Sequence, residues 1–277
     1  MTQLLNNRFF VLLLAPFLLG AITVLGFAPY SLTFINFITF PILLLLIFSV
    51  KKKTESKYRK KKSNRYFFYL GCAYGFGFFL IGNYWISISL THDESFSKLI
   101  PFALIFIPLF LSLFFGLVIL IVGPFADKNI RFILFFAVIF SLLEFIRGNI
   151  LTGFPWNLIA YTWSWSIESI QILSKIGAYS LSLVSLTLFC IPFLFLQGKI
   201  YKKNIIFFSI CLIFFIGNYF YGSNKVKNTI YDYDEDISIK IVSPNFSLKD
   251  YNKRSEIDQL KRLIKISHAD KDKKTLF

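Results

Sequence analysis

The sequence has few of the residues that most often perform chemistry or bind metals. Its three cysteines, Cys72, Cys190 and Cys211, all lie inside long apolar runs, and its two histidines, His92 and His268, are far apart. A reactive thiol needs a neighbouring cation or base, and none of the three cysteines has one beside it. The histidines lack a companion at metal-ligand spacing. We therefore predict no cysteine nucleophile, disulfide, metal site or cofactor in this chain.

Charged residues are also scarce within the apolar runs. The acidic or basic residues nearest to their interiors, such as Glu144, Glu168 and Lys175, lie near the ends of runs. A transporter would be expected to carry ionisable groups inside its spans. The scarcity therefore argues against a transporter.

Apolar residues dominate what remains. Hydrophobic residues make up 56% of the chain, 36 residues are Phe, and the mean hydropathy is +0.62. A soluble surface cannot cover that composition, and a helical span needs roughly 18 to 20 apolar residues. Candidate runs cover residues 9–28, 30–50, 66–90, 99–123, 130–146, 170–197 and 204–221. We predict a polytopic α-helical membrane bundle of about seven spans in residues 1–221.

Basic residues are concentrated in two of the connecting loops. Residues 51–65 hold nine Lys or Arg and one Glu, and Lys199, Lys202 and Lys203 follow the sixth run. By the positive-inside rule both loops are cytoplasmic, so residues 144–166 and everything after 221 face outward. The rule and the attraction of anionic lipid also account for the net charge of +15, so we expect no nucleic-acid partner.

Two stretches interrupt the apolar pattern, one on the predicted outer side and one that runs through the third apolar run to its outer end. Residues 144–161 read EFIRGNILTGFPWNLIAY, and residues 71–90 read GCAYGFGFFLIGNYWISISL. In the second stretch Gly71 and Gly75 form a small-xxx-small pair, which lets another helix approach closely. Its Tyr84 and Trp85 belong either to an aromatic belt or to a grip on a lipid.

The pattern changes after residue 221. Residues 236–242 (DISIKIV) alternate like a half-buried strand, residues 255–267 repeat apolar positions at helical spacing, and residues 275–277 resemble the start of another strand. We predict the beginning of an α/β layer in residues 222–277. A segment this short cannot close such a core, so we expect the chain to stop within a domain.

These stretches together resemble the apolipoprotein N-acyltransferases, bacterial membrane enzymes of the nitrilase superfamily. EFIRGNILTGFPW is similar to the family's E-[FW]-L-R-G-x-x-x-T-G-F-P-W segment. LGFAPY (25–30) resembles its first hairpin, residues 71–90 its Gly-rich span, and ISIKIVSPNFSLKDYNK (237–253) the opening of its nitrilase-like α-β-β-α sandwich. The resemblance covers nearly the whole chain in order. It implies a C-terminally truncated chain whose residues 222–277 form the incomplete N-terminal part of the extracytoplasmic catalytic domain.

The resemblance implies a monomer in the bacterial inner membrane with its catalytic domain on the periplasmic side. Its partners would be a phospholipid acyl donor, a diacylated apolipoprotein acceptor and membrane lipids. A Cys thioester would carry the acyl chain, and the family's Glu, Lys and Cys are expected beyond Phe277. The fragment itself is therefore predicted to be inactive. Alternatives are a membrane-anchored nitrilase-type amidase, a module fused to a glycosyltransferase, and a non-catalytic membrane scaffold.

The resemblance also points to candidate residues for a lipid groove. Arg147 is either a lipid-phosphate contact or an outer-end charge paired with Glu144. Trp156, fixed by a rigid Gly-Phe-Pro turn, either lines the acyl groove or belongs to the aromatic belt, and Trp163 is expected to be an interfacial anchor. The full candidate set is Arg147, Thr152, Gly153, Pro155, Trp156, Tyr84, Trp85, Asn245 and Lys249.

Overall fold

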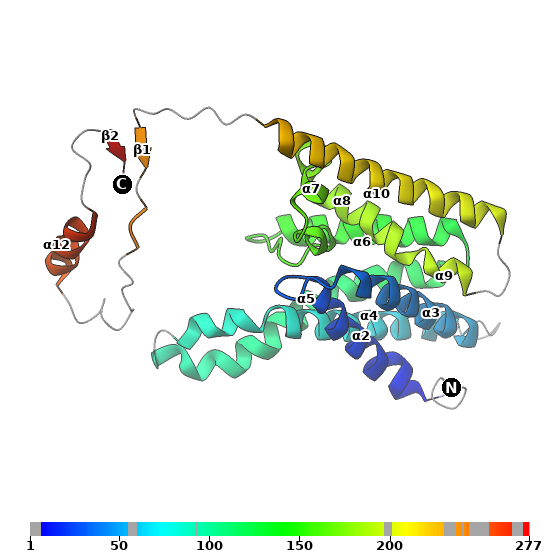
Figure 1. The fold of residues 1–277 in the computed structure, drawn as a ribbon. Helices are drawn as coiled ribbons and strands as arrows, with labels where there is room; N and C mark the ends of the chain where they lie inside the picture. The colour runs from blue at the N-terminus through cyan, green and yellow to red at the C-terminus, as the bar shows by residue number, and fades with distance from the viewer. Residues whose placement is uncertain are drawn as a thin grey trace.

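The protein folds as a bundle of helices followed by a small strand-helix-strand segment, as seen in a computed structural model (Figure 1). The structure describes residues 7–54, 60–91, 94–196, 201–229, 237–239, 241–243, 255–267 and 274–276. The main helices are α2 (Ala15–Thr23), α3 (Asn36–Thr54), α4 (Lys60–Gly82), α5 (Ile100–Val122), α6 (Ile130–Asn149), α7 (Ile167–Ile170), α8 (Leu173–Cys190), α9 (Pro192–Phe195) and α10 (Lys202–Asn228). Each of the seven apolar runs therefore contains helix.

Four helical stretches in the described part of the chain are long and apolar enough to cross a membrane. They are Thr33–Thr54, Ser95–Phe125, Leu173–Phe195 and Lys202–Asn228, and a shorter apolar helix covers Phe10–Gly26. Helix α6 carries Arg131, Glu144 and Arg147, which lowers its hydropathy. The structure is thus that of a polytopic helical membrane region, and the total of seven spans stays a prediction.

The third apolar run ends its α-helix earlier than expected. Helix α4 stops at Gly82, and the chain continues as two 3₁₀ helices, η4 (Tyr84–Thr91) and η5 (Glu94–Leu99), before α5 begins. The break directly follows Gly82, a residue with weak helix propensity. The aromatic residues of the run therefore lie on η4 rather than on a continuous helix.

Helices α4 and α5 pack along each other at close range. A side chain on Gly71 would collide with the backbone carbonyl of Phe115, and one on Gly75 would meet Ser112 Cα at 2.9 Å. Helices in lipid have no hydrophobic driving force for association, so close packing of their backbones stabilises the pair instead. The predicted packing role of Gly71 and Gly75 is confirmed.

Phenylalanine rings fill the centre of the bundle. Phe40 of α3, Phe115 of α5 and Phe140 of α6 are all buried, and their rings meet, with 4.9 Å between the centroids of Phe115 and Phe140. Edge-to-face aromatic contacts of this kind stabilise a core beyond the burial of their area. One aromatic core thus joins α3, α5 and α6.

The outer surface of the bundle is apolar. Large side chains such as Phe102 and Phe106 of α5, and Ile213 and Phe220 of α10, are more than half exposed. In water, apolar surface of this extent would be unstable, whereas lipid tails solvate it. The exposed surface therefore agrees with a membrane-spanning bundle.

The segment after α10 contains the elements expected from its sequence. Strand β1 (Ile237–Ile239) pairs in parallel with strand β2 (Lys274–Leu276), with Ile237 opposite Lys274, and helix α12 (Glu256–Ser267) lies between them in the chain. Parallel strands joined through a helix form a β-α-β unit. Residues 244–254, which include the predicted site residues Asn245 and Lys249, lie outside the described residues.

Candidate functional site

A tight turn follows α6 and contains the Gly-Phe-Pro-Trp tetrapeptide. In this GFPW turn (residues 150–158), Leu151, Gly153 and Asn157 have positive φ angles of 56°, 76° and 55°. A Cβ atom on Gly153 would lie 2.6 Å from the carbonyl oxygen of Gly148. Both the backbone angle and the lack of space therefore require glycine at 153.

Arg147, in the last turn of α6, holds this turn in place. Its Nη1 donates hydrogen bonds to the carbonyl oxygens of Phe154 and Trp156, at 3.0 and 2.8 Å. The side chain is only 3% exposed, and its guanidinium lies 5.1 Å from the ring centroid of Phe79. Carbonyl dipoles and an aromatic face thus compensate a buried cation. Both of these hydrogen bonds go to the turn, so the guanidinium acts on the turn itself.

Glu144 holds the other end of the same segment. Its Oε1 accepts a hydrogen bond from the Ile159 backbone N–H at 3.1 Å, and the side chain is 4% exposed. The next amide, of Ala160, donates to Ser182 Oγ at 3.0 Å. Burial, together with Tyr179 and Glu144, raises the pKa of the neighbouring Tyr161. Two side chains of α6 therefore hold this segment: Arg147 binds the backbone carbonyls of Phe154 and Trp156, and Glu144 binds the backbone amide of Ile159.

The two unusual stretches of the sequence meet at this turn. The rings of Trp85 on η4 and Trp156 lie edge to face, with centroids 5.6 Å apart at 74°. Beside them, Asn157 Nδ2 donates to Asn83 Oδ1 at 2.9 Å. Trp85 and Trp156 remain 44% and 53% exposed, so their contact lies at the surface of the bundle and not in its core. We call these two residues the rim pair.

A pocket of about 350 Å³ opens beside the turn. Three of the predicted site residues, Arg147, Thr152 and Gly153, line it. Its other walls are apolar and come mainly from α5 and the turn: Phe106, Ile107, Phe110, Leu111, Phe114, Ile150, Leu151 and Phe154. A charged group at the back of an apolar pocket suits an amphiphilic molecule better than a fully polar one.

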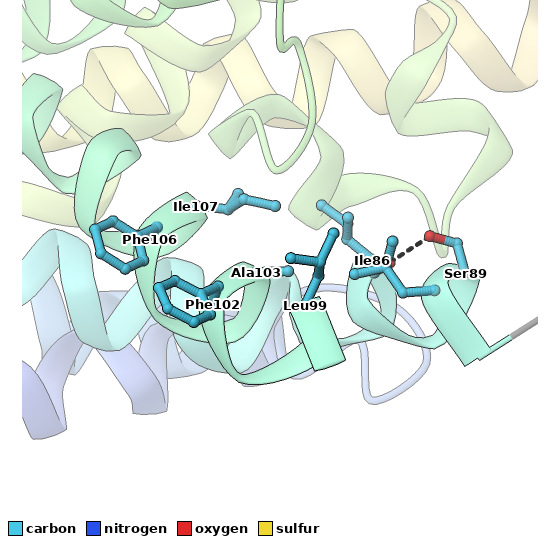
Figure 2. Close-up of a pocket in the computed structure, with 8 residues that line it drawn as sticks. Ile86, Ser89, Leu99, Phe102, Ala103, Phe106 and Ile107 are labelled. Atoms are coloured by element: carbon cyan, nitrogen blue, oxygen red, sulfur yellow. Dashed lines mark hydrogen bonds between the residues drawn. The ribbon is translucent and has the colours of Figure 1, made fainter. Parts of the chain in front are cut away.

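A second apolar pocket, of about 450 Å³, adjoins the first along α5. Figure 2 shows its walls: Phe102, Ala103, Phe106 and Ile107 of α5, Leu99 of η5, and Ile86 and Ser89 of η4, with Leu90 completing the lining. Ser89 is the one polar residue of this lining, and its hydroxyl is satisfied because Oγ donates to the Ile86 carbonyl at 2.6 Å. Both pockets share Phe106 and Ile107. We call the two together the α5 groove.

The predicted site residues fall into four groups. Arg147, Thr152 and Gly153 line the α5 groove, whereas Trp85 and Trp156 form the rim pair. Pro155 and Tyr84 are exposed, on the GFPW turn and on η4. Asn245 and Lys249 lie outside the described residues.

Three features of the site were not anticipated from sequence. The α5 lining comes from a continuous apolar run, which carries no signal of a groove. The sequence suggests Glu144 only as a partner of Arg147, although Glu144 Oε1 accepts a hydrogen bond from the Ile159 backbone N–H. Trp163 is not a simple interfacial anchor, because its Nε1 donates to Ser185 Oγ at 2.9 Å and its ring stacks on Phe189.

The fold and this site define a polytopic membrane protein with an apolar groove and a tryptophan rim at the ends of its helices. Comparison with known proteins identifies the family. The family profile described as the apolipoprotein N-acyltransferase N-terminal domain matches residues 19–191. The chain belongs to the apolipoprotein N-acyltransferase family.

Individual relatives agree with the family match. The chain is similar to apolipoprotein N-acyltransferases of Rickettsia typhi, with 34% identity over 83% of this chain and 43% of the relative, and of Brucella melitensis, with 28% identity over 84% of this chain and 44% of the relative. The relative in Rhodopseudomonas palustris is 33% identical over 65% of this chain and 33% of its own length. The chain thus spans less than half the length of the curated relatives it matches.

Proposed function

We propose that this chain forms the membrane part of an enzyme that transfers a fatty acyl chain from a phospholipid to the N-terminal amine of a diacylglyceryl-cysteine lipoprotein. Membership of the family and the names of the relatives support the activity. Because the chain matches less than half of those relatives, we propose that the catalytic Cys, Glu and Lys belong to the remaining part of the enzyme.

The proposed reaction has two acyl transfers. A Cys thiolate, formed when the Glu accepts the thiol proton, attacks the ester carbonyl carbon of the phospholipid, while the Lys stabilises the oxyanion. The ester C–O bond breaks, the leaving lysophospholipid oxygen takes the proton, and a thioester remains. The free amine of the lipoprotein cysteine then attacks the thioester carbonyl. The C–S bond breaks, the thiolate is restored, and the amine gives its proton to the Glu as the amide forms.

In this scheme the α5 groove holds an acyl chain of the donor phospholipid. The observation that carries the proposal is the composition of the groove, whose apolar α5 wall faces the Arg147 end of the GFPW turn. Apolar walls match the hydrocarbon of an acyl chain. The exposed Trp85 and Trp156 rings suit the boundary between lipid tails and headgroups. Arg147 acts chiefly by fixing the turn, since its Nη1 is committed to two carbonyl oxygens.

The β-α-β unit after α10 is proposed to begin the nitrilase-like catalytic domain. Its parallel strands support this, because parallel pairing is typical of buried sheets that need further covering layers. In α12, Ile257, Leu260 and Ile264 are exposed and have no covering partner within the described part of the chain. We propose that this domain lies on the periplasmic side of the bacterial inner membrane, where both lipid substrates would reach it.

A chimera tests the proposed activity. This chain replaces the matching part of the Rickettsia typhi relative, and the purified protein is incubated with labelled phospholipid and a diacylated lipopeptide. We expect triacylated lipopeptide and a hydroxylamine-sensitive acyl-enzyme. Release of free fatty acid or ammonia without acyl transfer would contradict the proposal and favour an amidase or hydrolase.

The chain by itself serves as the control. Its only cysteines, Cys72, Cys190 and Cys211, lie in the apolar helices α4, α8 and α10. Apolar surroundings disfavour a thiolate, so the isolated chain should form neither the thioester nor the product. An acyl adduct on one of these three cysteines would overturn the assignment of the nucleophile to another part of the enzyme.

A further inference from the structure

Another pocket, whose lining includes two basic residues, lies at the other end of the bundle. Its volume is about 560 Å³, and its lining includes Lys51 from the end of α3, Phe125 from the loop after α5, and Arg131 and Phe135 from α6. Lys51 is the first residue of the basic segment 51–65, and the GFPW turn follows the opposite end of α6. The proposed acyl transfer makes no use of it.

The cations of this pocket come from two different helices. Lys51 Nζ donates to the Ala126 carbonyl oxygen at 2.9 Å, which holds the end of α3 against the 123–129 loop. Arg131, in the first turn of α6, is exposed at the mouth. Nearby, Lys128 Nζ lies 5.1 Å from the ring centroid of Phe48. Two basic side chains therefore line the pocket, and Lys128 adds a third next to Asp127 in the chain.

One acidic side chain, Asp127, also lines the pocket. Its Oδ1 accepts from the Lys128 backbone N–H at 2.7 Å, and its Oδ2 accepts from Asn129 Nδ2 at 2.5 Å. Asn129 in turn caps α6, since its Oδ1 accepts from the Phe132 N–H at 2.8 Å. The carboxylate is thus occupied by local donors that hold the loop, and the cations outnumber it.

The remaining lining is apolar and aromatic. Phe125 is 64% exposed, and its ring meets that of Phe135 edge to face at 5.5 Å. An aromatic pair and two cations in the lining of one pocket fit a molecule with an anionic head and a hydrocarbon tail. Basic pockets between helices at the cytoplasmic surface are a known means of binding anionic lipid headgroups.

We propose that this pocket binds one anionic phospholipid from the leaflet that faces the basic segment 51–65. Arg131 contacts the phosphodiester, Lys51 adds positive potential behind it, and Phe125 and Phe135 contact the first part of an acyl chain. The lipid stabilises the junction of α3, the 123–129 loop and α6. It is a structural ligand, distinct from the acyl donor.

The test measures lipid selectivity of the whole chain in nanodiscs that contain equal amounts of phosphatidylglycerol and phosphatidylcholine. A photoactivatable phosphatidylglycerol should crosslink to residues 124–135, and unlabelled phosphatidylglycerol should compete better than phosphatidylcholine. Arg131→Gln should weaken crosslinking about fivefold, because one basic residue near an anionic surface contributes on that scale. Arg131→Lys keeps the charge and should retain most of the crosslinking.

Matched controls separate this site from general surface charge. Lys202→Gln removes one charge from the start of α10, outside the pocket, and should leave crosslinking at 124–135 unchanged. Equal loss in Arg131→Gln and Lys202→Gln, or equal competition by the two lipids, would overturn the proposal. Displacement by water-soluble glycerophosphate at the same concentration would reassign the pocket to free phosphate. None of these readouts depends on acyl transfer.

Discussion

The indole rings of Trp85 and Trp156 meet edge to face, with 5.6 Å between their centroids. Trp85 follows the end of α4, whereas Trp156 follows α6, so the contact joins two stretches that are far apart in the sequence. The hydrogen bond from Asn157 to Asn83 adds a second link at the same place. These contacts therefore join η4 and the GFPW turn, which each line one pocket of the α5 groove.

The rim pair predicts a functional difference between exposed tryptophans. In the chimera with the Rickettsia typhi relative, Trp156→Ala should lower the rate of acyl transfer roughly tenfold, because the loss of its ring contact with Trp85 lets the GFPW turn shift beside the groove. Trp165→Ala is the control, since Trp165 is similarly exposed but bonds to Thr33 Oγ1, away from the groove. Trp163 is unsuitable as a control, because it packs on Phe189. Equal, mild effects of both substitutions would show that Trp156 belongs to the aromatic belt and has no special role in acyl transfer.

The backbone of the GFPW turn predicts a stability difference between two glycines. Gly153→Ala should lower the free energy of unfolding by about 1–3 kcal/mol, because Gly153 has a φ of 76° and no space for a Cβ atom. Gly217→Ala in α10 meets nothing within 4 Å and should be neutral or stabilising by up to about 1 kcal/mol. Titration with a denaturing detergent, followed by tryptophan fluorescence, compares the two. A smaller loss at 153 than at 217 would contradict the assigned turn geometry.

The contacts of Arg147 predict a large effect of removing its charge. Arg147→Met should destabilise the bundle by about 3 kcal/mol, because the carbonyl oxygens of Phe154 and Trp156 lose a charged donor. Arg131→Gln, at the exposed beginning of the same helix, should change stability by less than about 0.5 kcal/mol. The same detergent titration measures both. If Arg147→Met left stability unchanged but abolished transfer, Arg147 would instead be a substrate contact.

The charge distribution predicts the orientation of the bundle. Single cysteines are introduced at Lys52 and Thr229 in a background without native cysteines. A membrane-impermeant thiol reagent applied to spheroplasts should label position 229 and leave position 52 protected until the cells are opened. This outcome follows because the basic end of α3 is expected inside and the end of α10 outside. The reverse labelling pattern would refute the proposed orientation.

Much of the fold could be predicted from the sequence, because long apolar runs admit little besides helices in lipid. The close packing at Gly71 and Gly75 was also predictable, since small residues at that spacing are a direct signature of helix contact. The end of α4 at Gly82 was not. A run that stays apolar and aromatic through residue 90 gives no sign that its backbone changes from α to 3₁₀.

The site was predictable in part for a related reason. Arg147, Gly153 and Trp156 stood out because charged, flexible and rigid residues interrupt an apolar pattern. The α5 wall of the groove could not be found this way, because Phe106 and Ile107 look like any lipid-facing residues in the sequence. Which face of α5 forms a groove depends on where η4 and the GFPW turn lie beside it, and that is a tertiary property.

The most direct test of the central proposal, that the α5 groove holds the donor acyl chain, is a change in the chain length that the enzyme prefers. Ala103→Trp places a large ring in the Figure 2 pocket, whereas Leu117→Trp places the same ring on an exposed part of α5 outside both pockets. In the chimera, competing phospholipids with long and short acyl chains are offered together, and the transferred chains are weighed by mass spectrometry. The account predicts that Ala103→Trp lowers long-chain transfer relative to short-chain transfer by roughly tenfold, since each buried methylene carries a measurable share of binding, and that Leu117→Trp does not. An unchanged ratio in Ala103→Trp, with transfer otherwise intact, would contradict the assignment of the groove to the acyl chain.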